Sequence, residues 1–260
     1  MSRKLVTAIA ILGYAMLHLP LVLLIAWSFN ASPSGARWTH ATLGWYRALW
    51  HRADLLAALR TSLIVAVVAT TVATVIGTLG ALALGRSSGR RTQFVEGFLL
   101  FPIVTPEVVA GISLLILFAA AGIRLGLATV IIAHTTFCVP FTMLVILARL
   151  RGMDRTLEDA ALSLGADEFT AFRRVTLPLL MPGIVSAALL AFTLSFDDFI
   201  ITFFTAGPGT STLPLVVYGM VRRTVEPTVN ALSALLVIGT TVLLIVAQRR
   251  MRDPHATGAA

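Results

Sequence analysis

The chain has 260 residues, of which 57% are hydrophobic and 12% are charged, and its mean hydropathy is +0.90. A soluble domain of this length carries about twice that charged fraction, so the composition excludes an ordinary soluble protein. The net charge of +8 does not indicate nucleic-acid binding, because the basic residues lie between long apolar runs, as expected for the loops of a membrane protein.

Six apolar segments are each long enough to cross about 30 Å of hydrocarbon as a helix. Helices are expected because backbone groups in lipid must be hydrogen-bonded within the segment. We expect the first run to be a retained span, since it is too long for the apolar part of a signal peptide and lacks a clear cleavage site. The chain is therefore predicted to be one all-α polytopic membrane domain, 1–260, with spans at about 6–28, 61–84, 98–121, 126–148, 183–205 and 229–248.

The distribution of positive charge predicts the orientation. Thirteen of the twenty Lys and Arg residues fall in segments that are cytoplasmic if both termini are cytoplasmic, and seven fall outside. Cytoplasmic loops are enriched in Lys and Arg. We therefore predict a multi-pass membrane protein with both termini in the cytoplasm.

The second and third spans carry local packing signals. The second has small residues at four-residue spacing, which allow a close helix–helix contact. In the third, Pro102 and Pro106 each remove a helical hydrogen bond and predict a bend. The small residues of the second span are Ala69, Ala73, Gly77, Ala81 and Gly85.

The inner loop at 149–182 contains more structure than a simple connection needs. Thr156 followed by Asp159 has the form of a capping box, and an apolar stripe runs from Leu157 to Leu164. Gly165 follows as a helix-ending residue, and a second short helix is predicted from Asp167 until Leu177-Pro178 breaks it. Such an element can dock a soluble partner. The alternative is an interfacial helix on the lipid surface.

The same loop resembles the signature of permeases from binding-protein-dependent ABC importers. That signature is Glu-Ala-Ala, three residues, Gly, nine residues, then Ile-x-Leu-Pro. Here Asp159-Ala160-Ala161 is followed after three residues by Gly165, and after nine more by Val175-Thr176-Leu177-Pro178. The resemblance implies a type I importer fold whose cytoplasmic coupling helix sits in a groove of the ATPase. It assigns to this coupling Glu158, Asp159, Ala160, Ala161, Gly165, Ala166, Asp167, Glu168, Leu177 and Pro178.

Further stretches are similar to the C-type permeases of spermidine/putrescine importers, and the likeness covers nearly the whole chain. They include Phe101–Gly111, Phe192–Asp198, Gly207-Pro208-Gly209 and Asn230-Ala231-Leu232. The resemblance implies a location in the bacterial inner membrane and transport by alternating access. It also implies four partners besides lipid: two ATPase subunits, a second and different permease, and an external solute-binding protein.

The chain lacks the residues of a motor or an enzyme. A P-loop needs a lysine after its glycines, but the only lysine is Lys4, with no glycine before it. Neither a metal-ligand cluster nor a Gly-x-Ser-x-Gly motif occurs. We therefore expect no catalytic residues, metal or cofactor in this chain, with ATP and Mg²⁺ held by the partner ATPase.

Three of the twelve acidic residues fall inside predicted spans: Glu107, Asp197 and Asp198. A carboxylate at membrane depth costs at least roughly 2.5 kcal/mol, so it usually faces a wet cavity or a partner. At about 100° per residue, Asp198 lies on a polar stripe and Asp197 about 100° away, so one can face a pathway while the other bonds a neighbouring helix. We predict a pathway for a cationic solute lined by Asp198 and Glu107, with Asp197, Ser195, Thr202 and Trp45.

Other interpretations of these residues stay open. The carboxylates can instead stabilise bends, and Trp45 can be an interface anchor rather than a cation–π face. His18 and His134 are expected to bond between helices rather than bind a ligand. A secondary transporter would explain the acids but not the inner-loop signature. Within the importer family, the solute can also be an opine, an amino-acid derivative or a metal complex.

Overall fold

The computed structural model describes residues 3–33, 37–85, 87, 89–154, 156–223 and 227–252. Arg86, and Arg155 of the predicted coupling loop, lie outside these residues. The chain divides into two units, one of Met1–Leu56 with Val216–Ala260 and one of Ala57–Leu215. The second unit holds every predicted site residue except Trp45.

Four helices among the described residues are long and apolar enough to cross a membrane. They are α1 (Arg3–Trp27), α3 (Ala53–Gly85), α6 (Leu127–Arg151) and the continuous helix Glu168–Asp197. A fifth span exists only if α4 (Arg90–Val104) and α5 (Glu107–Ala120) are counted together. The last helix, α12 (Pro227–Arg252), contributes a shorter apolar stretch at 227–242. The structure thus supports four or five spans, and the number six stays a prediction.

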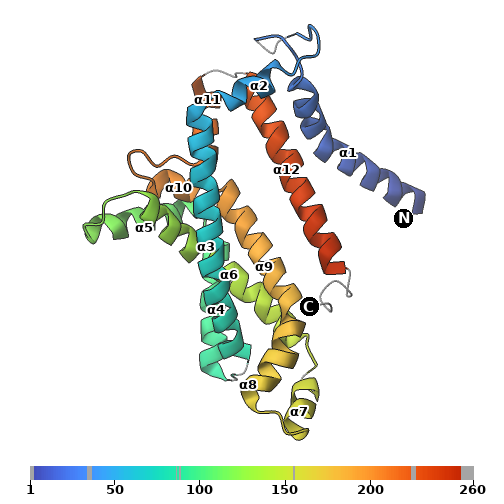
Figure 1. Ribbon diagram of the computed structural model, residues 1–260, viewed down its shortest axis with the longest axis vertical. Helices are drawn as coiled ribbons and strands as arrows, with labels where there is room; N and C mark the ends of the chain where they lie inside the picture. Colours follow the sequence, from blue (N-terminus) through green and yellow to red (C-terminus); the bar gives the residue numbers. More distant parts are fainter. Residues whose placement is uncertain are drawn as a thin grey trace. The chain divides into compact units, whose positions relative to one another are not determined.

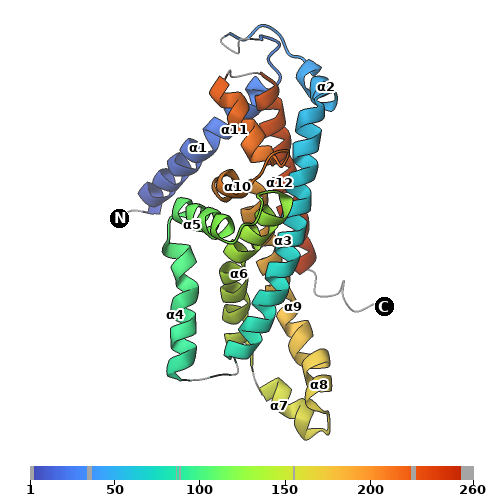
Figure 2. The same cartoon turned by 90° about the vertical axis from the view of Figure 1, so that its left-hand side faces the viewer.

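The predicted third span is broken, because α4 and α5 meet at 103° (Figure 2). The bend follows from Pro106. Thr105, the residue before it, is extended with φ −72° and ψ 133°, as sterics before proline favour. Pro102 lies inside α4 without ending it. Of the two prolines, only Pro106 therefore produces the expected break.

The predicted helix break at Leu177-Pro178 is wrong. α8 (Glu168–Ala171), the π-helical turn η1 (Phe172–Thr176) and α9 (Leu177–Asp197) form one continuous helix. In the π turn, the N–H of Leu177 bonds to the carbonyl of Phe172. Pro178, the second residue of α9, follows directly after the π turn, where the helical hydrogen bonding is already irregular and a missing N–H costs less.

The helix instead ends further along, at Asp197. Asp198 is extended, with φ −66° and ψ 128°, and α10 (Ile200–Thr205) begins two residues later. The predicted fifth span at 183–205 therefore consists of α9, a corner and α10.

The small-residue face of α3 packs against α6, as predicted. Ala69, Ala73 and Ala81 are fully buried. A Cβ added at Gly77 would lie 2.2 Å from the hydroxyl of Thr142, and the same hydroxyl donates a hydrogen bond to the carbonyl of Ala73 at 2.9 Å. α6 also packs along α9 (Figure 1), so it is the central helix of this unit.

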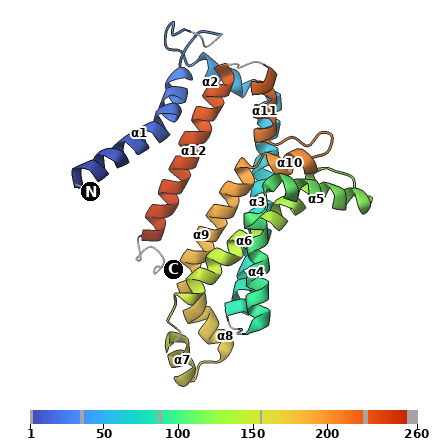
Figure 3. The ribbon, with the colours of Figure 1, turned by 180° about the vertical axis from the view of Figure 1, so that it is seen from behind.

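The predicted inner loop at 149–182 contains two short helices, α7 (Thr156–Ser163) and α8, at one end of α9 (Figure 1). In the other unit, α12 contacts α1, which diverges from it toward the N-terminus (Figure 3), and α12 also contacts α2 (Gly44–Trp50). The apolar pattern did not predict α2 or α11 (Leu213–Arg223), because both are too short to cross a membrane. None of the side chains of α1 is buried within this chain.

Candidate functional site

The corner between α9 and α10 is organised by the carboxylate of Asp198. One carboxylate oxygen accepts the N–H of Ile201 at 3.1 Å. The other accepts the N–H and the hydroxyl of Thr202 at 2.9 and 3.0 Å. These N–H groups belong to the first turn of α10 and have no partner within that helix. Asp198 therefore caps α10, and only 8% of it is exposed.

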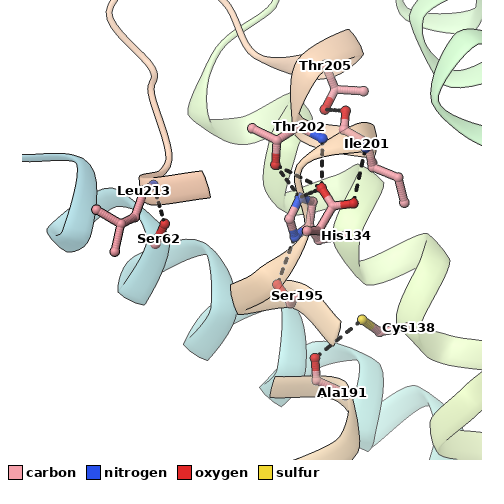
Figure 4. Close-up of polar contacts among 10 residues, drawn as sticks. Ser62, His134, Cys138, Ala191, Ser195, Ile201, Thr202, Thr205 and Leu213 are labelled. Atoms are coloured by element: carbon pink, nitrogen blue, oxygen red, sulfur yellow. Dashed lines mark hydrogen bonds and ion pairs between the residues drawn. The ribbon is translucent and has the colours of Figure 1, made fainter. Parts of the chain in front are cut away.

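His134 on α6 joins this corner to the central helix (Figure 4). Its Nδ1 lies 2.8 Å from the hydroxyl of Ser195, and its Nε2 lies 2.9 Å from the hydroxyl of Thr202. The same Nε2 lies 3.2 Å from the Asp198 carboxylate. The prediction that His134 bonds between helices is confirmed. His18 differs, because its Nδ1 lies 2.9 Å from the carbonyl of Tyr14 in its own helix.

The predicted polar stripe faces the interior of the protein. Ser195, Asp198, Thr202 and Thr205 are all buried, at 4%, 8%, 0% and 0% exposed. The hydroxyl of Thr205 donates to the carbonyl of Ile201. The stripe predicted as a pathway lining is thus, within this chain, a hydrogen-bonded network.

Asp197 and Glu107 differ from Asp198 because both are exposed. Among the residues that the structure describes, none bonds to the carboxylate of Asp197. Of the two adjacent aspartates, Asp198 is therefore the one that bonds a neighbouring helix. Glu107 begins α5, where the helix dipole favours a carboxylate.

The helix that carries Glu107 packs against the corner. Gly111 lies one turn after Glu107, and a Cβ added there would lie 2.7 Å from the ring of Phe204 and 3.5 Å from the carbonyl of Ile200. Both residues belong to α10. The bend at Pro106 thus places the start of a helix, with its acid, next to α10.

Trp45 lies in the other unit, on α2, and is half-buried. Its indole N–H donates to the carbonyl of Asn30 at 2.8 Å. This bond gives the side chain a structural role in its own unit. A role for its ring in the pathway stays a prediction.

The inner-loop element has the local geometry that the sequence predicted at its glycine. Gly165 has φ +91°, a conformation that favours glycine. The N–H of Ala166 bonds to the carbonyl of Ala161 at 3.1 Å, and the N–H of Gly165 bonds to that of Leu162 at 3.0 Å. These two bonds form a Schellman motif, which ends α7 and turns the chain into α8.

The start of α7 differs from the predicted capping box. The carboxylate of Asp154 accepts the N–H of Thr156 at 2.9 Å, so the cap comes from Asp154. This hydrogen bond lowers the pKa of the Asp154 carboxyl below its ordinary value. Thr156 is itself the first helical residue.

The predicted coupling residues lie on the surface of this element. Leu164 and Phe169 are 89% and 67% exposed, which leaves an apolar face uncovered in this chain. The predicted residues Asp159, Ala160, Gly165, Asp167, Glu168 and Pro178 are exposed, and Glu158, Ala161, Ala166 and Leu177 are half-buried. Such exposed apolar groups on a short helix are typical of a contact surface.

A hydrogen bond ties α7 to the base of the long helix. The hydroxyl of Thr176, in the π turn, donates to the carboxylate of Glu158 at 2.8 Å. The two residues line a cavity of about 180 Å³ together with Leu82 of α3 and Leu150 of α6. This hydrogen bond connects α7 to η1, which is continuous with α9.

Two residues of these sites were not singled out as functional from the sequence. His134 is the hub of the corner, and Arg149 bonds α6 to α9 by donating to the carbonyl of Leu179 at 3.0 and 3.2 Å. Gly183 makes room for Arg149, because an added Cβ there would lie 2.6 Å from its Cγ. The sequence offered one signal for His134, which is a histidine inside an apolar span. Only the fold shows that it faces the carboxylate of Asp198.

The fold defines a class: a multi-pass α-helical membrane protein that carries an exposed element of two short helices. The chain belongs to the family described as "Binding-protein-dependent transport system inner membrane component", which matches residues 73–252.

Named relatives and a solved structure agree with this family. The chain is 42% identical over 92% of its length, and 91% of the relative, to the "Spermidine/putrescine transport system permease protein PotC" of Escherichia coli strain K12. It is 39% identical over 88% of its length, and 84% of the relative, to the "Putrescine transport system permease protein PotI" of the same organism. One chain in a crystal structure of a bacterial alginate ABC transporter has a similar fold, with TM-score 0.73 and 13% sequence identity. The match covers 99% of this chain and 97% of the transporter chain.

These findings confirm the general predictions. The chain is a permease subunit of an ABC importer rather than an enzyme, and it is a multi-pass protein of the inner membrane. The solved structure shares the fold alone, because the identity is low.

Proposed function

We propose that this permease passes polyamines, such as spermidine and putrescine, or a similar cationic solute into the cytoplasm. The observation that carries the proposal is the 42% identity, over 92% of the chain, to a permease named for spermidine/putrescine transport. The relative named for putrescine transport supports the same class of solute.

The charge of the site fits a solute with several ammonium groups. Asp197 and Glu107 are exposed carboxylates that lie within predicted spans, where an unpaired charge is costly. An ammonium group makes a charge-assisted hydrogen bond to a carboxylate. We assign the direct contact to Asp197 and Glu107. Asp198, Ser195 and Thr202 belong to the same site as its supporting network, and Trp45 is retained as a candidate cation–π face.

The energy source in this proposal is external to the chain. α7, Gly165 and α8 form the coupling element that docks in a groove of an ATPase, and that ATPase binds ATP and Mg²⁺. Two ATPase subunits, a second and different permease, and a solute-binding protein outside the membrane complete a type I importer. Six spans with both termini in the cytoplasm place the coupling element on the ATPase side, and transport proceeds by alternating access.

The test is uptake by the complete importer, expressed in cells that lack other polyamine uptake. Radiolabelled putrescine and spermidine should accumulate, and Asp197→Asn should lower the initial rate by about tenfold, because charged clefts raise solute capture by about that factor or more. Asp54→Asn is the matched control. It removes the same charge from an exposed aspartate whose ion pair with Arg52 spans 2.8 Å at the surface.

Two results would contradict the proposal. One is the absence of polyamine uptake by an importer that accumulates an opine, an amino-acid derivative or a metal complex instead. The other is equal uptake by the Asp197→Asn and Asp54→Asn variants. Uptake that persists without any ATPase subunit would indicate a secondary transporter.

A further inference from the structure

The corner between α9 and α10 depends on a residue far away in the sequence. Asp198 bonds locally to the first turn of α10, but those bonds do not fix the corner against the rest of the protein. The only titratable group bonded to Asp198 among the described residues is His134 of α6, at 3.2 Å. At 1% exposed, His134 has little access to water.

The hydrogen-bond pattern indicates which imidazole nitrogen faces Asp198 as a donor. The Thr202 hydroxyl donates its single proton to Asp198, so it can only accept from a second partner. Nε2 of His134, at 2.9 Å from that hydroxyl and 3.2 Å from the carboxylate, must therefore carry a hydrogen. Nδ1 completes the link through the hydroxyl of Ser195, at 2.8 Å.

The imidazole thus binds both sides of the corner at once. Ser195 lies in the last turn of α9, and Thr202 lies in the first turn of α10 (Figure 4). Between them, Asp198 is held inward. Its neighbour Asp197, the last residue of α9, is then left exposed.

We propose that His134 is a positioning residue that holds Asp198 inward and thereby keeps the carboxylate of Asp197 directed outward at the end of α9. The function of that carboxylate as a ligand for a cationic solute rests on the proposed function. The orientation does not rest on it. Without the imidazole donor, the Asp198 carboxylate loses a partner that it needs in a buried place. If the corner then rotates so that Asp198 reaches water, the same rotation carries Asp197 inward.

The single cysteine of the chain makes this orientation measurable. Cys138 is fully buried, so it should react little with a thiol reagent and contribute a low background. In the complete importer in nanodiscs, Asp197→Cys should react rapidly with a small maleimide, read out on this chain after gel separation. Adding His134→Leu should lower that rate by about tenfold, as expected if the outward orientation falls to about one tenth of its population in the parent.

Two controls separate positioning from general damage. His134→Gln keeps an N–H donor near the place of Nε2 and should hold the labelling rate of Asp197→Cys within about twofold of the parent. General unfolding would act with the opposite sign, because it would expose Cys138 and raise labelling there. Asp54→Cys, on an exposed residue of α3, should label equally with and without His134→Leu.

An unchanged labelling rate of Asp197→Cys in the His134→Leu background would overturn the inference, and so would an equal loss in His134→Gln. If His134→Leu does not assemble, Thr202→Val and Ser195→Ala each remove one imidazole partner and should each slow the same labelling. In chains that keep Asp197, putrescine uptake should fall in His134→Leu and recover in His134→Gln. If no variant takes up polyamines, the proposed function fails while the labelling result still decides the orientation.

Discussion

Replacing the two adjacent aspartates one at a time separates their roles. Asp198→Asn keeps the shape of the side chain but has only one accepting oxygen. In the native protein one carboxylate oxygen accepts from Ile201, and the other accepts from Thr202 and lies 3.2 Å from His134 Nε2. If the amide oxygen of the asparagine accepts from Thr202, its NH₂ group faces the N–H of Ile201. The N–H of Ile201 is then left without a partner.

The expected cost follows from these contacts. An unsatisfied buried donor costs about 1–3 kcal/mol, and a hydrogen bond to a charged group contributes about 1.5–3 kcal/mol. These costs overlap, so we expect Asp198→Asn to lower the free energy of unfolding by about 3 kcal/mol. Asp197→Asn changes an exposed side chain and should stay within about 0.5 kcal/mol of the native protein.

The assay uses the buried Cys138 as a reporter of unfolding. The purified importer is heated with a fluorescent maleimide, and labelling of this chain is followed on gels. At about 2–4 °C per kcal/mol for a chain of this size, the midpoint should fall by about 6–12 °C in Asp198→Asn. It should stay near the native value in Asp197→Asn, whose uptake nevertheless falls. Equal midpoints for the two variants, or a larger loss in Asp197→Asn, would refute the assignment of structural and pathway roles.

Three further substitutions test the packing and the coupling element. Gly207→Ala places a Cβ 1.9 Å from the backbone carbonyl of Leu125, so it should lower stability by about 3 kcal/mol, measured by the same thermal assay. Thr176→Val removes the hydrogen bond to Glu158 and should cost about 1 kcal/mol locally, seen as faster proteolysis of 156–168 with an unchanged thermal midpoint. Gly165→Ala should cost about 1–2 kcal/mol at φ +91° and reduce co-purification of the ATPase, and full recovery of the complex would contradict the docking role.

The parts of the fold that the sequence predicted correctly depend on local chemistry. Apolar runs predicted α1, α3 and α6 because a helix in lipid needs only its own backbone bonds and an apolar surface. Gly165 predicted the end of α7 because few other residues adopt a positive φ at a helix end. Pro106 predicted a bend because the missing N–H and the ring act on the adjacent turn.

The parts that were missed depend on contacts between distant residues or on small changes of helix type. Pro178 was expected to end a helix, but the neighbouring π turn accommodates it. The corner at Asp198 has no proline or glycine to mark it. It forms because His134, distant in the sequence, supplies a donor to a carboxylate that also caps α10. No pattern within the span encodes that partner.

The two aspartates show why a polar stripe alone cannot assign a pathway residue. A stripe of hydroxyls and an acid on one helix face is as consistent with a bonded network as with a wet lining. The facing helix decides between them, and here α6 presents the donor of His134 to Asp198 and Ser195. Once those groups are satisfied by the protein, they have little capacity left for a passing solute. The acid outside the stripe, Asp197, keeps its full capacity to accept hydrogen bonds, and this is the property that a transient cation site requires.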